Sequence, residues 1–201
     1  MKVYYDYQIF MHQKFGGVSK YFINLVENLN DFELNKKIIA PFHKNYYLAG
    51  KDTNVKKFIY FDLKTKNINF LSHKINKLYT KYLYNIKTPN IFHFTYFNEK
   101  YYLKKKTKHI ITIYDLIKEK FYNSQHQKGI NIKKEYFKNV DRIICISKNT
   151  KKDLIDLYGI DEKIIDVIHL GVSFKKNFIS IDHLLPRKPF ILFVGARSRY
   201  K

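Results

Sequence analysis

The amino-acid sequence predicts an α/β fold, in which a Rossmann-like parallel sheet carries helices on both faces. The first observation is a strand–helix–strand succession between residues 141 and 172. Apolar runs of strand type at 142–147 and 164–170 flank a helical pattern that ends at Gly159. Short connections between these parts predict a βαβ unit with parallel strands. The second observation is size, because 201 residues that are 45% hydrophobic can bury a full core.

The first strand is expected at residues 2–9, which are rich in Val, Tyr and Ile. Apolar residues then recur at helical spacing from Val18 to Leu29, so Gly16 and Gly17 stand at the N-terminus of the first helix. Two residues without side chains let a phosphate or a sugar approach the backbone amides there. A plain tight turn is the alternative explanation of the glycine pair.

Two further strands are expected at 37–42 and 56–61, and a helix is expected at 67–85. The apolar residues of this helix share one face: Ile68, Leu71, Ile75, Leu78, Tyr82 and Leu83. Lysines occupy the other face. The pattern predicts a basic surface helix that packs its apolar face inward.

The fourth and fifth strands, at 89–95 and 109–115, bring polar residues to the expected ligand edge of the sheet. His93 lies near the end of the fourth strand, where it could hydrogen-bond a sugar hydroxyl or be a satisfied core histidine. Tyr114 and Asp115 end the fifth strand. Asp115 could contact a ligand or cap the turn before Leu116.

A polar helical pattern at 123–139 is expected to cover the sheet, and a sixth strand follows it at 142–147. Thr150 and Asp153 have the spacing of a capping box at the start of the next helix. Ser147 ends the strand. Its hydroxyl could cap this helix, which is the favoured interpretation, or touch an anionic ligand at the helix N-terminus.

The chain is strongly basic, with a formal net charge of +21. This charge favours an anionic partner, although Lys, Asn, Ile, Tyr and Phe share A/T-rich codons and genomic bias explains the charge equally well. Acidic lipid fits better than nucleic acid, because no helix-turn-helix, zinc-finger or RNA-binding signature occurs. The lone cysteine, Cys145, lies in an apolar strand and is expected to be buried in a reducing compartment. With no signal peptide and no membrane-spanning run, we expect a cytoplasmic protein.

Composition changes after Gly171. Residues 1–172 are expected to form one domain and 173–188, which contain Pro186, an interdomain linker. A new apolar run begins at Pro189, so 189–201 is expected to be the first strand and loop of a second, truncated Rossmann domain.

Four segments stand out in the chain and together cover nearly all of it. The most regular is RIICISKNTKKDLIDLYGIDEKIIDVIHLGV, and the others are FGGVSKYFINLVENL, ITIYDLI and PFILFVGARSRYK. These segments resemble, in the same order, parts of family 4 glycosyltransferases, retaining enzymes of the glycosyltransferase B fold with two Rossmann domains. The most regular segment resembles the end of the family's N-terminal domain.

The resemblance implies transfer of a hexose from a nucleotide diphosphate sugar to a polysaccharide or lipopolysaccharide acceptor. Mannose is a common donor sugar among similar enzymes, but no residue here selects it. No metal is expected, in agreement with the lack of a D-x-D motif. The alternative, from another class, is a non-catalytic basic α/β binding module or partner subunit at an anionic membrane surface.

The same resemblance assigns roles to single residues. Gly16 and Gly17 match the glycine loop on the donor side, and Arg197 and Lys201 match the basic pair that clamps the donor diphosphate. Arg199 competes for this assignment. Tyr114 and Asp115 match a position usually written His-Asp, whose histidine contacts the donor sugar. Tyr114 departs from the pattern, since a phenol donates a hydrogen bond but does not titrate near neutral pH.

Most of the family's donor domain, including its E-x7-E pattern, has no counterpart in these residues. The chain alone is therefore expected to be inactive, with a second chain as a candidate source of the donor domain. In the family the region matching 67–85 helps to bind the acceptor and can lie on the membrane. This implies a location at the inner face of the plasma membrane.

Overall fold

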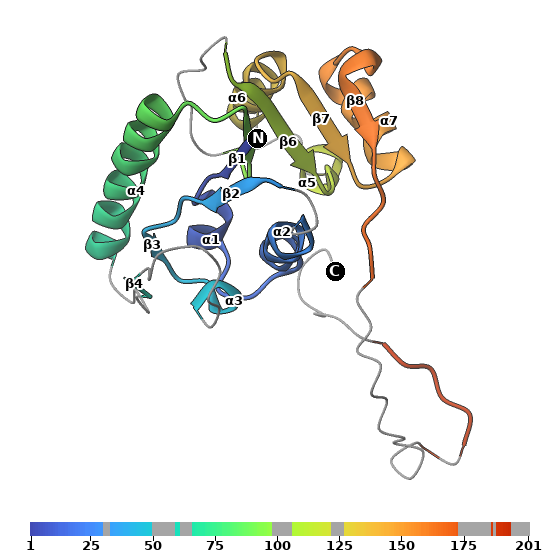
Figure 1. Ribbon diagram of the computed structural model, residues 1–201. Coiled ribbons are helices and arrows are strands. Elements are labelled where there is room, and N and C mark those ends of the chain that lie inside the picture. Colours follow the sequence, from blue (N-terminus) through green and yellow to red (C-terminus); the bar gives the residue numbers. More distant parts are fainter. Residues whose placement is uncertain are drawn as a thin grey trace. The chain divides into compact units, whose positions relative to one another are not determined.

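A computed structural model describes residues 1–29, 33–49, 59–60, 66–97, 106–121, 127–172, 186 and 188–193 of the chain. Residues Met1–Leu170 form one compact unit, and Gly171–Lys201 form a second. The first unit is built on a six-stranded sheet with the strand order β2-β1-β5-β6-β7-β8 (Figure 1). In this order, the strands are Asn35–Ile38, Lys2–Tyr5, Ile91–Phe94, Lys108–Ile113, Arg142–Cys145 and Ile165–Val167.

Every neighbouring pair in this sheet is parallel, so all six strands end at the same edge. Side chains alternate between two buried cores. On one face, Phe92 and Ile111 belong to a core that includes residues of α4 (Lys66–Lys87), α6 (Gln127–Lys138) and α7 (Lys148–Tyr158). On the other, Val3 and Tyr5 pack with α1 (Gln8–His12), α2 (Gly17–Asn28) and α3 (Tyr46–Ala49). The predicted Rossmann-like sheet with helices on both faces is thereby confirmed.

The βαβ unit is confirmed as well. Strand β7 pairs in parallel with β8, and Gly159 ends α7 in the left-handed conformation with φ of 62°. The predicted capping box is wrong, because the helix begins three residues earlier. The Thr150 N–H donates to Ser147 Oγ at 3.0 Å, and Asp153 instead pairs with Lys120 at 2.7 Å. Ser147 therefore has the capping role that the sequence favoured.

The first strand is shorter than predicted, ending at Tyr5 instead of residue 9. The Asp6 carboxylate accepts a hydrogen bond from the backbone N–H of Gln8 at 3.3 Å, which turns the chain into helix α1. The apolar residues Ile9 and Phe10 are fully buried in that helix. Because this helix is buried, its residues are as apolar as those of a strand, and the sequence pattern did not separate the two.

The region predicted as a second and a third strand divides differently. The run 37–42 contains the end of β2 and the start of β3 (Phe42–His43), which are two separate strands. Of the run 56–61 only β4 (Ile59–Tyr60) lies within the described residues, and it pairs with β3 in a small parallel sheet of its own. The prediction of a single strand at 37–42 is wrong, because the chain turns between Ile38 and Phe42.

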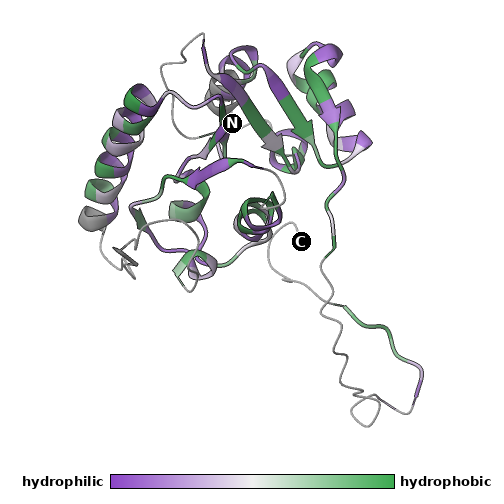
Figure 2. Cartoon of the chain, viewed as in Figure 1, coloured by the Kyte–Doolittle hydropathy of each residue, from purple (hydrophilic) through white to green (hydrophobic). Residues whose placement is uncertain are grey.

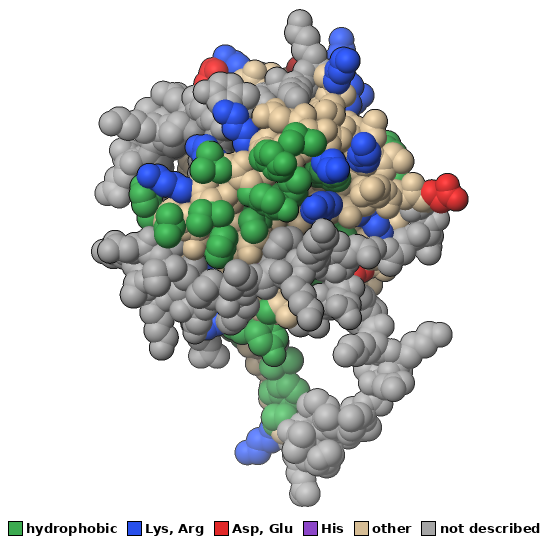
Figure 3. Space-filling model, turned by 60° about the vertical axis from the view of Figure 1, so that its left-hand side comes forward, with side chains coloured by type: hydrophobic (Ala, Val, Ile, Leu, Met, Phe, Trp, Pro, Cys, Tyr) green, Lys and Arg blue, Asp and Glu red, His purple; other side chains and the backbone are tan. Residues whose placement is uncertain are grey.

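Helix α4 exists as predicted, but its apolar face points to solvent instead of into the core. Its exposed side includes Phe70, Leu71, Ile75, Leu78, Tyr82 and Ile86, with Leu78 68% exposed. Its buried side carries Ser72, Asn76 and Thr80 in addition to Leu83 and Tyr84. Figure 2 shows hydrophilic and hydrophobic bands alternating along the helix, and Figure 3 shows apolar side chains between lysines on this side of the molecule. The prediction that Leu71, Ile75, Leu78 and Tyr82 pack inward is therefore wrong.

A pair of hydrogen bonds from Asn76 explains the inversion. The side chain of Asn76 accepts from Phe42 N–H and donates to Phe42 C=O, each at 2.9 Å. The amide thus satisfies both backbone groups of one β3 residue, as a neighbouring strand would. The polar side of α4 is therefore held against β3.

The described residues of the second unit, 171–172, 186 and 188–193, contain no helix or strand. The side chains of Phe190, Ile191, Leu192 and Phe193 are exposed. The described residues 189–193 of the strand predicted from Pro189 onward do not form a strand. The assignment of 189–201 to a second Rossmann domain stays a prediction.

Candidate functional site

The candidate site is the edge of the sheet where its parallel strands end, which we call the carboxyl edge. Asp6 follows β1 directly, Thr95 follows β5, Tyr114 follows β6, and Ser147 lies two residues after β7. Helices α2 and α7 begin at the same edge. In open α/β sheets, ligands bind at this edge, close to helix N-termini.

The glycine loop shapes the start of α2. Gly16 is its N-cap. A Cβ atom there would lie 2.2 Å from Gln13 Oε1, so the Gln13 carboxamide occupies the space that a side chain at position 16 would fill. This carboxamide accepts a hydrogen bond from the backbone N–H of Ser19 at 3.2 Å. A Cβ at Gly17 would meet no atom within 4 Å. The Gln13 carboxamide therefore caps the start of α2 in the space beside Gly16, while the space beside Gly17 is open.

His93 has the environment of a buried core histidine, one of the two interpretations of the sequence. It is 4% exposed, and its Nε2 lies 2.9 Å from Thr112 Oγ1. Its ring contacts those of Tyr5 and Phe22, at centroid distances of 5.5 and 5.2 Å. Burial lowers the pKa of His93 to about 3, so the imidazole is neutral.

Tyr114 lies on the same face of the sheet as His93. Its ring meets Tyr21 edge-on at 5.6 Å, and its hydroxyl is buried without a hydrogen-bond partner among the described residues. Burial, and then the neighbouring Tyr21, raises the pKa of the Tyr114 phenol. Tyr21 hydrogen-bonds Thr112, which also binds His93. The Tyr114 hydroxyl thus has a hydrogen-bond donor that no described residue uses.

Asp115 and Ser147 both have local structural partners. The exposed Asp115 accepts from the Ile117 N–H at 3.3 Å, at the start of α5 (Ile117–Phe121). Ser147 Oγ accepts from Thr150 N–H and lies 2.9 Å from Thr150 Oγ1. Each therefore caps a helix at the carboxyl edge. Arg197 and Lys201 lie outside the described residues.

A buried network at Asp6 was not predicted from the sequence. The Asp6 carboxylate is fully buried, accepting from the Thr95 N–H at 3.1 Å, the Thr95 hydroxyl and the Gln8 amide at 2.6 Å. It joins the ends of β1 and β5. Burial raises the pKa of Asp6 to about 6, although these hydrogen bonds act in the opposite direction. An acid within an apolar segment, YYDYQIF, was the only signal for it.

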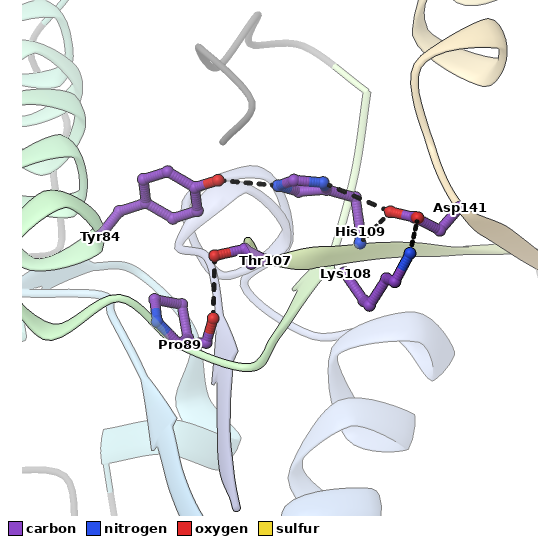
Figure 4. A network of polar contacts seen from close by, with 6 residues as sticks. All are labelled: Tyr84, Pro89, Thr107, Lys108, His109 and Asp141. Atoms are coloured by element: carbon purple, nitrogen blue, oxygen red, sulfur yellow. Dashed lines mark hydrogen bonds and ion pairs between the residues drawn. The ribbon is translucent and has the colours of Figure 1, made fainter. Parts of the chain in front are cut away.

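A second polar network lies at the opposite edge (Figure 4). The Tyr84 hydroxyl lies 2.8 Å from His109 Nε2, and His109 Nδ1 lies 3.6 Å from Asp141, which also pairs with Lys108. These groups resemble the parts of a catalytic triad. However, Lys108 and His109 begin β6, so the network lies at the amino ends of the strands. Its role is to bind α4, β6 and the segment before β7 together.

Comparisons with known proteins agree with this architecture. The sequence profile described as Glycosyltransferase Family 4 matches residues 15–176. The fold is similar to the apo form of the lipopolysaccharide outer core galactosyltransferase WaaB, with a TM-score of 0.50 and 16% identity, over 88% of this chain and 47% of WaaB. A glycosyltransferase from Rickettsia africae ESF-5 aligns with a TM-score of 0.47 and 17% identity, over 86% of this chain and 43% of its own. No curated protein sequence matches the chain.

The parallel sheet and its carboxyl edge define a Rossmann-like α/β domain of the glycosyltransferase type. The chain belongs to glycosyltransferase family 4, whose profile covers most of its length. It spans about half the length of the two solved structures to which it is similar. None of the helices in the described residues combines the length and apolar character needed to span a bilayer.

Proposed function

We propose that this chain is the acceptor-side half of a retaining hexosyltransferase. The enzyme transfers a hexose from a nucleotide diphosphate sugar to the carbohydrate of a surface polysaccharide or lipopolysaccharide. The observation that carries the proposal is the family match over residues 15–176, which includes the part of the carboxyl edge from Gly16 to Ser147. The likeness to WaaB, a galactosyltransferase, supports a hexose donor.

Each site residue has a role in this proposal. The open end of α2 at Gly16 and Gly17 receives the donor, because the helix N-terminus favours negative charge. Tyr114 donates its unpartnered hydroxyl to an oxygen of the bound sugar, and Asp115 supplies a second polar contact beside it. His93 acts behind the site, through Thr112 and Tyr21, and Ser147 through the cap of α7.

The chemistry needs stabilisation of the leaving diphosphate. Arg197 and Lys201 hold this diphosphate in the proposal, and together with helix N-termini they offset its charge as the glycosidic bond breaks. The acceptor hydroxyl attacks from the face that the diphosphate leaves. The proposed enzyme needs no resident metal and works in the cytoplasm, where nucleotide sugars are made.

A complete cleft requires a donor-binding half in addition to Met1–Leu170. In the proposal this half comes from a longer form of the same polypeptide or from a second chain. The isolated 201-residue chain then has no turnover of its own.

The test is transfer by the native protein, purified from its own cells with whatever completes it. A panel of nucleotide diphosphate hexoses is offered with a cell-envelope carbohydrate fraction, with and without EDTA. We expect release of one nucleotide diphosphate, retention of the anomeric configuration, and no effect of the chelator. Absence of transfer from every donor would refute the function, and inversion of configuration would refute the mechanism.

A second function, binding to an anionic membrane surface, is favoured by the inverted helix α4. The exposed stripe of Phe70, Leu71, Ile75, Leu78, Tyr82 and Ile86 faces solvent along a helix of 22 residues, about 33 Å long. The helix has lysines at 66, 74, 77, 81 and 87 and no acidic residue. Apolar side chains between lysines are typical of helices that lie in the headgroup region of acidic lipids.

Vesicle flotation tests this second function. We expect the protein to float with vesicles containing phosphatidylglycerol and to remain behind with pure phosphatidylcholine. The double variant Leu71→Gln/Leu78→Gln should lose flotation. A matched variant that removes two apolar side chains elsewhere, Phe121→Gln/Ile168→Gln, should retain it, since both residues are exposed outside α4. Equal loss in both variants would contradict a role for α4.

A further inference from the structure

Two aromatic side chains lie exposed beside the start of α2. Phe15 directly precedes the glycine pair, and Tyr46 is the first residue of α3. Their rings contact each other, with centroids 5.1 Å apart and planes tilted by 36°. Even so, Phe15 is 57% exposed and Tyr46 is 60% exposed. We call these two residues the aromatic platform.

Hydrogen bonds hold the backbone that carries the platform. The N–H of Tyr46 donates to the carbonyl of Lys14 at 3.0 Å. The buried side chain of Asn45 donates to the carbonyl of Gln13 at 2.8 Å, and its oxygen accepts from the N–H of Leu48 at 3.3 Å. The loop before α2 is thus tied to the start of α3. Because this backbone is fixed before any ligand binds, the entropic cost of binding is lowered.

A third ring links the platform to the core. Tyr47 meets Phe15 edge-on, with centroids 6.2 Å apart and planes at 86°. Tyr47 is partly buried against the core around α1 and α2, and α3 lies beside α2 (Figure 1). Edge-on contacts of this kind are a favoured geometry for aromatic pairs. The position of the Phe15 ring is therefore set by two neighbouring rings, Tyr46 and Tyr47.

The platform adjoins the open end of α2. Gln13, whose carbonyl accepts from Asn45, also caps α2 through its side chain, which accepts from the Ser19 N–H at 3.2 Å. A Cβ atom at Gly17, two residues from Phe15, would meet no atom within 4 Å. A molecule bound at this open helix end therefore has the platform next to it.

The area of the platform favours a small ligand over a protein. An aromatic side chain can bury about 150–250 Å², so two that are little more than half exposed offer about 200–300 Å² together. A stable protein interface buries about 800 Å² on each partner. A pyranose ring has a face of about the size of an aromatic ring. The platform thus matches one or two sugar rings.

We infer that Phe15 and Tyr46 form a subsite that stacks on a sugar ring of the carbohydrate acceptor. A pyranose ring face without axial substituents presents C–H bonds, whose hydrogens carry a slight positive charge. The face of an aromatic ring is the negative part of its quadrupole, so the two faces attract each other while both leave water. The equatorial hydroxyl groups of the sugar point outward from the ring and stay hydrated.

The inference rests on the proposed function, because it identifies the stacked ring as part of the acceptor that Met1–Leu170 would bind. It narrows the substrate class to acceptors in which a pyranose close to the reacting hydroxyl has a face free of axial groups. A sugar with axial groups on both faces would be held away from the two rings.

The experiment measures sugar binding to the 201-residue chain without any donor. Oligosaccharides released from the envelope of the cells that make the protein are studied by saturation-transfer NMR, with the aromatic signals of the protein saturated. Methyl β-glucopyranoside and methyl α-mannopyranoside serve as defined probes. We expect transfer to the C–H protons of one ring face in the oligosaccharides and in the glucoside. Transfer to the mannoside should be much weaker, since it has an axial group on each face.

Ring variants locate the subsite. Phe15→Leu/Tyr46→Leu keeps apolar side chains but removes both rings, and it should weaken oligosaccharide binding by about tenfold or more. Phe15→Tyr/Tyr46→Phe exchanges the two rings and should bind as tightly as the native chain. The control Phe121→Leu removes an exposed ring at the end of α5 and should also bind as the native chain does.

The remaining outcomes also decide the question. Native affinity in Phe15→Leu/Tyr46→Leu, equal weakening in Phe121→Leu, or no transfer to any sugar overturns the inference. Uridine and guanosine are offered in the same experiment, because exposed aromatic rings also stack on nucleobases. Stronger transfer to these nucleosides than to the oligosaccharides would assign the platform to a base and overturn the inference as well.

This result is separable from the proposed function. Because no donor is present, a failure of hexose transfer in the separate assay leaves a positive binding result intact. If the completed enzyme transfers hexose while Phe15→Leu/Tyr46→Leu binds oligosaccharide as the native chain does, the subsite is refuted and the proposed function stands.

Discussion

The hydroxyl of Tyr114 is the residue-scale feature most open to a direct test. It is buried without a partner among the described residues, and a polar group in that state destabilises a protein unless a ligand completes it. Tyr114→Phe should therefore leave the free energy of unfolding unchanged or raise it by up to about 1 kcal/mol. Hexose transfer by the completed enzyme should fall by about 10- to 100-fold.

The matched variant is Tyr114→His, which introduces the histidine that the family resemblance leads us to expect at this position. We expect it to retain transfer, since an imidazole also donates a hydrogen bond. Urea unfolding and steady-state kinetics on the three proteins separate the two effects. A Phe variant that is as active as the native enzyme would exclude the hydroxyl from the reaction.

Asp6 gives a prediction about pH. Its pKa is raised to about 6 in the folded chain, while an unfolded aspartate has a pKa of about 3.9. Between these values the folded state holds more protons than the unfolded state, so the contribution of Asp6 to stability falls as the pH rises from about 4 to about 6. Above that window the loss is complete, and it amounts to at most about 3 kcal/mol.

The measurement is urea unfolding of the native chain and of Asp6→Asn at intervals from pH 4 to pH 7. The difference between the two stabilities should change across the window and be constant above it. Asp141 is a useful contrast, because hydrogen bonds and the charges of Lys108 and His109 lower its pKa despite desolvation. A difference that does not vary with pH would show that Asp6 is ionised throughout.

Single residues at the site were only partly predictable. Local patterns placed Gly16, Tyr114 and Ser147 at the ends of strands or the starts of helices, and the family resemblance supplied the expected role of Tyr114. The partners of other buried polar residues at this edge come from distant segments. Thr112 and Tyr21 lie near His93, and Thr95 binds Asp6. Which side chains meet across β1, β5 and β6 depends on strand order, and no periodicity in the sequence encodes that order.

At the scale of elements, α4 shows the limit of a periodic pattern. The spacing of Leu71, Ile75 and Leu78 correctly predicted a helix, since period 3.6 depends only on the backbone. It did not predict which face is buried. The bonds of Asn76 to β3 decide that, and nothing in the sequence around Asn76 indicated its partner.

This interpretation makes Asn76 more important for stability than the larger residues around it. Asn76→Ala should lower the free energy of unfolding by about 1 to 3 kcal/mol, because it removes the two hydrogen bonds that the Asn76 side chain makes with the backbone N–H and C=O of Phe42. Leu78→Gln should change it by no more than about 0.5 kcal/mol, since Leu78 is exposed. Urea denaturation compares the two. A larger loss for Leu78→Gln would mean that Leu78 is covered in solution.

The βαβ unit was predictable for the opposite reason. Ser147 and Gly159 mark the two ends of α7 in the sequence itself, and the connections to β7 and β8 are too short for another topology. The error in the capping box came from choosing Thr150 over Ser147. Both have hydroxyl groups, and only the Thr150 N–H bond to Ser147 shows which residue is the cap.

At the scale of the whole molecule, the net charge of +21 bears on the proposed attachment to acidic membranes. Exposed charges are screened over about 8 Å at physiological ionic strength and over shorter distances at higher salt. We expect flotation with phosphatidylglycerol vesicles to weaken as NaCl rises from 50 to 500 mM. Part of it should persist, because the apolar contact of α4 is not screened. Complete loss would indicate that charge acts alone.

The order of the strands has a consequence for how the chain is made. Strand β1 is synthesised first, yet its neighbour β5 ends at Phe94. Among the described residues, every buried member of the core beneath α4, α6 and α7 except Tyr4 and Ile39 comes from residue 83 or later. A nascent chain that has just emerged therefore cannot cover that face of β1. We expect its apolar surface to need shelter on the ribosome until the second half of the sheet arrives.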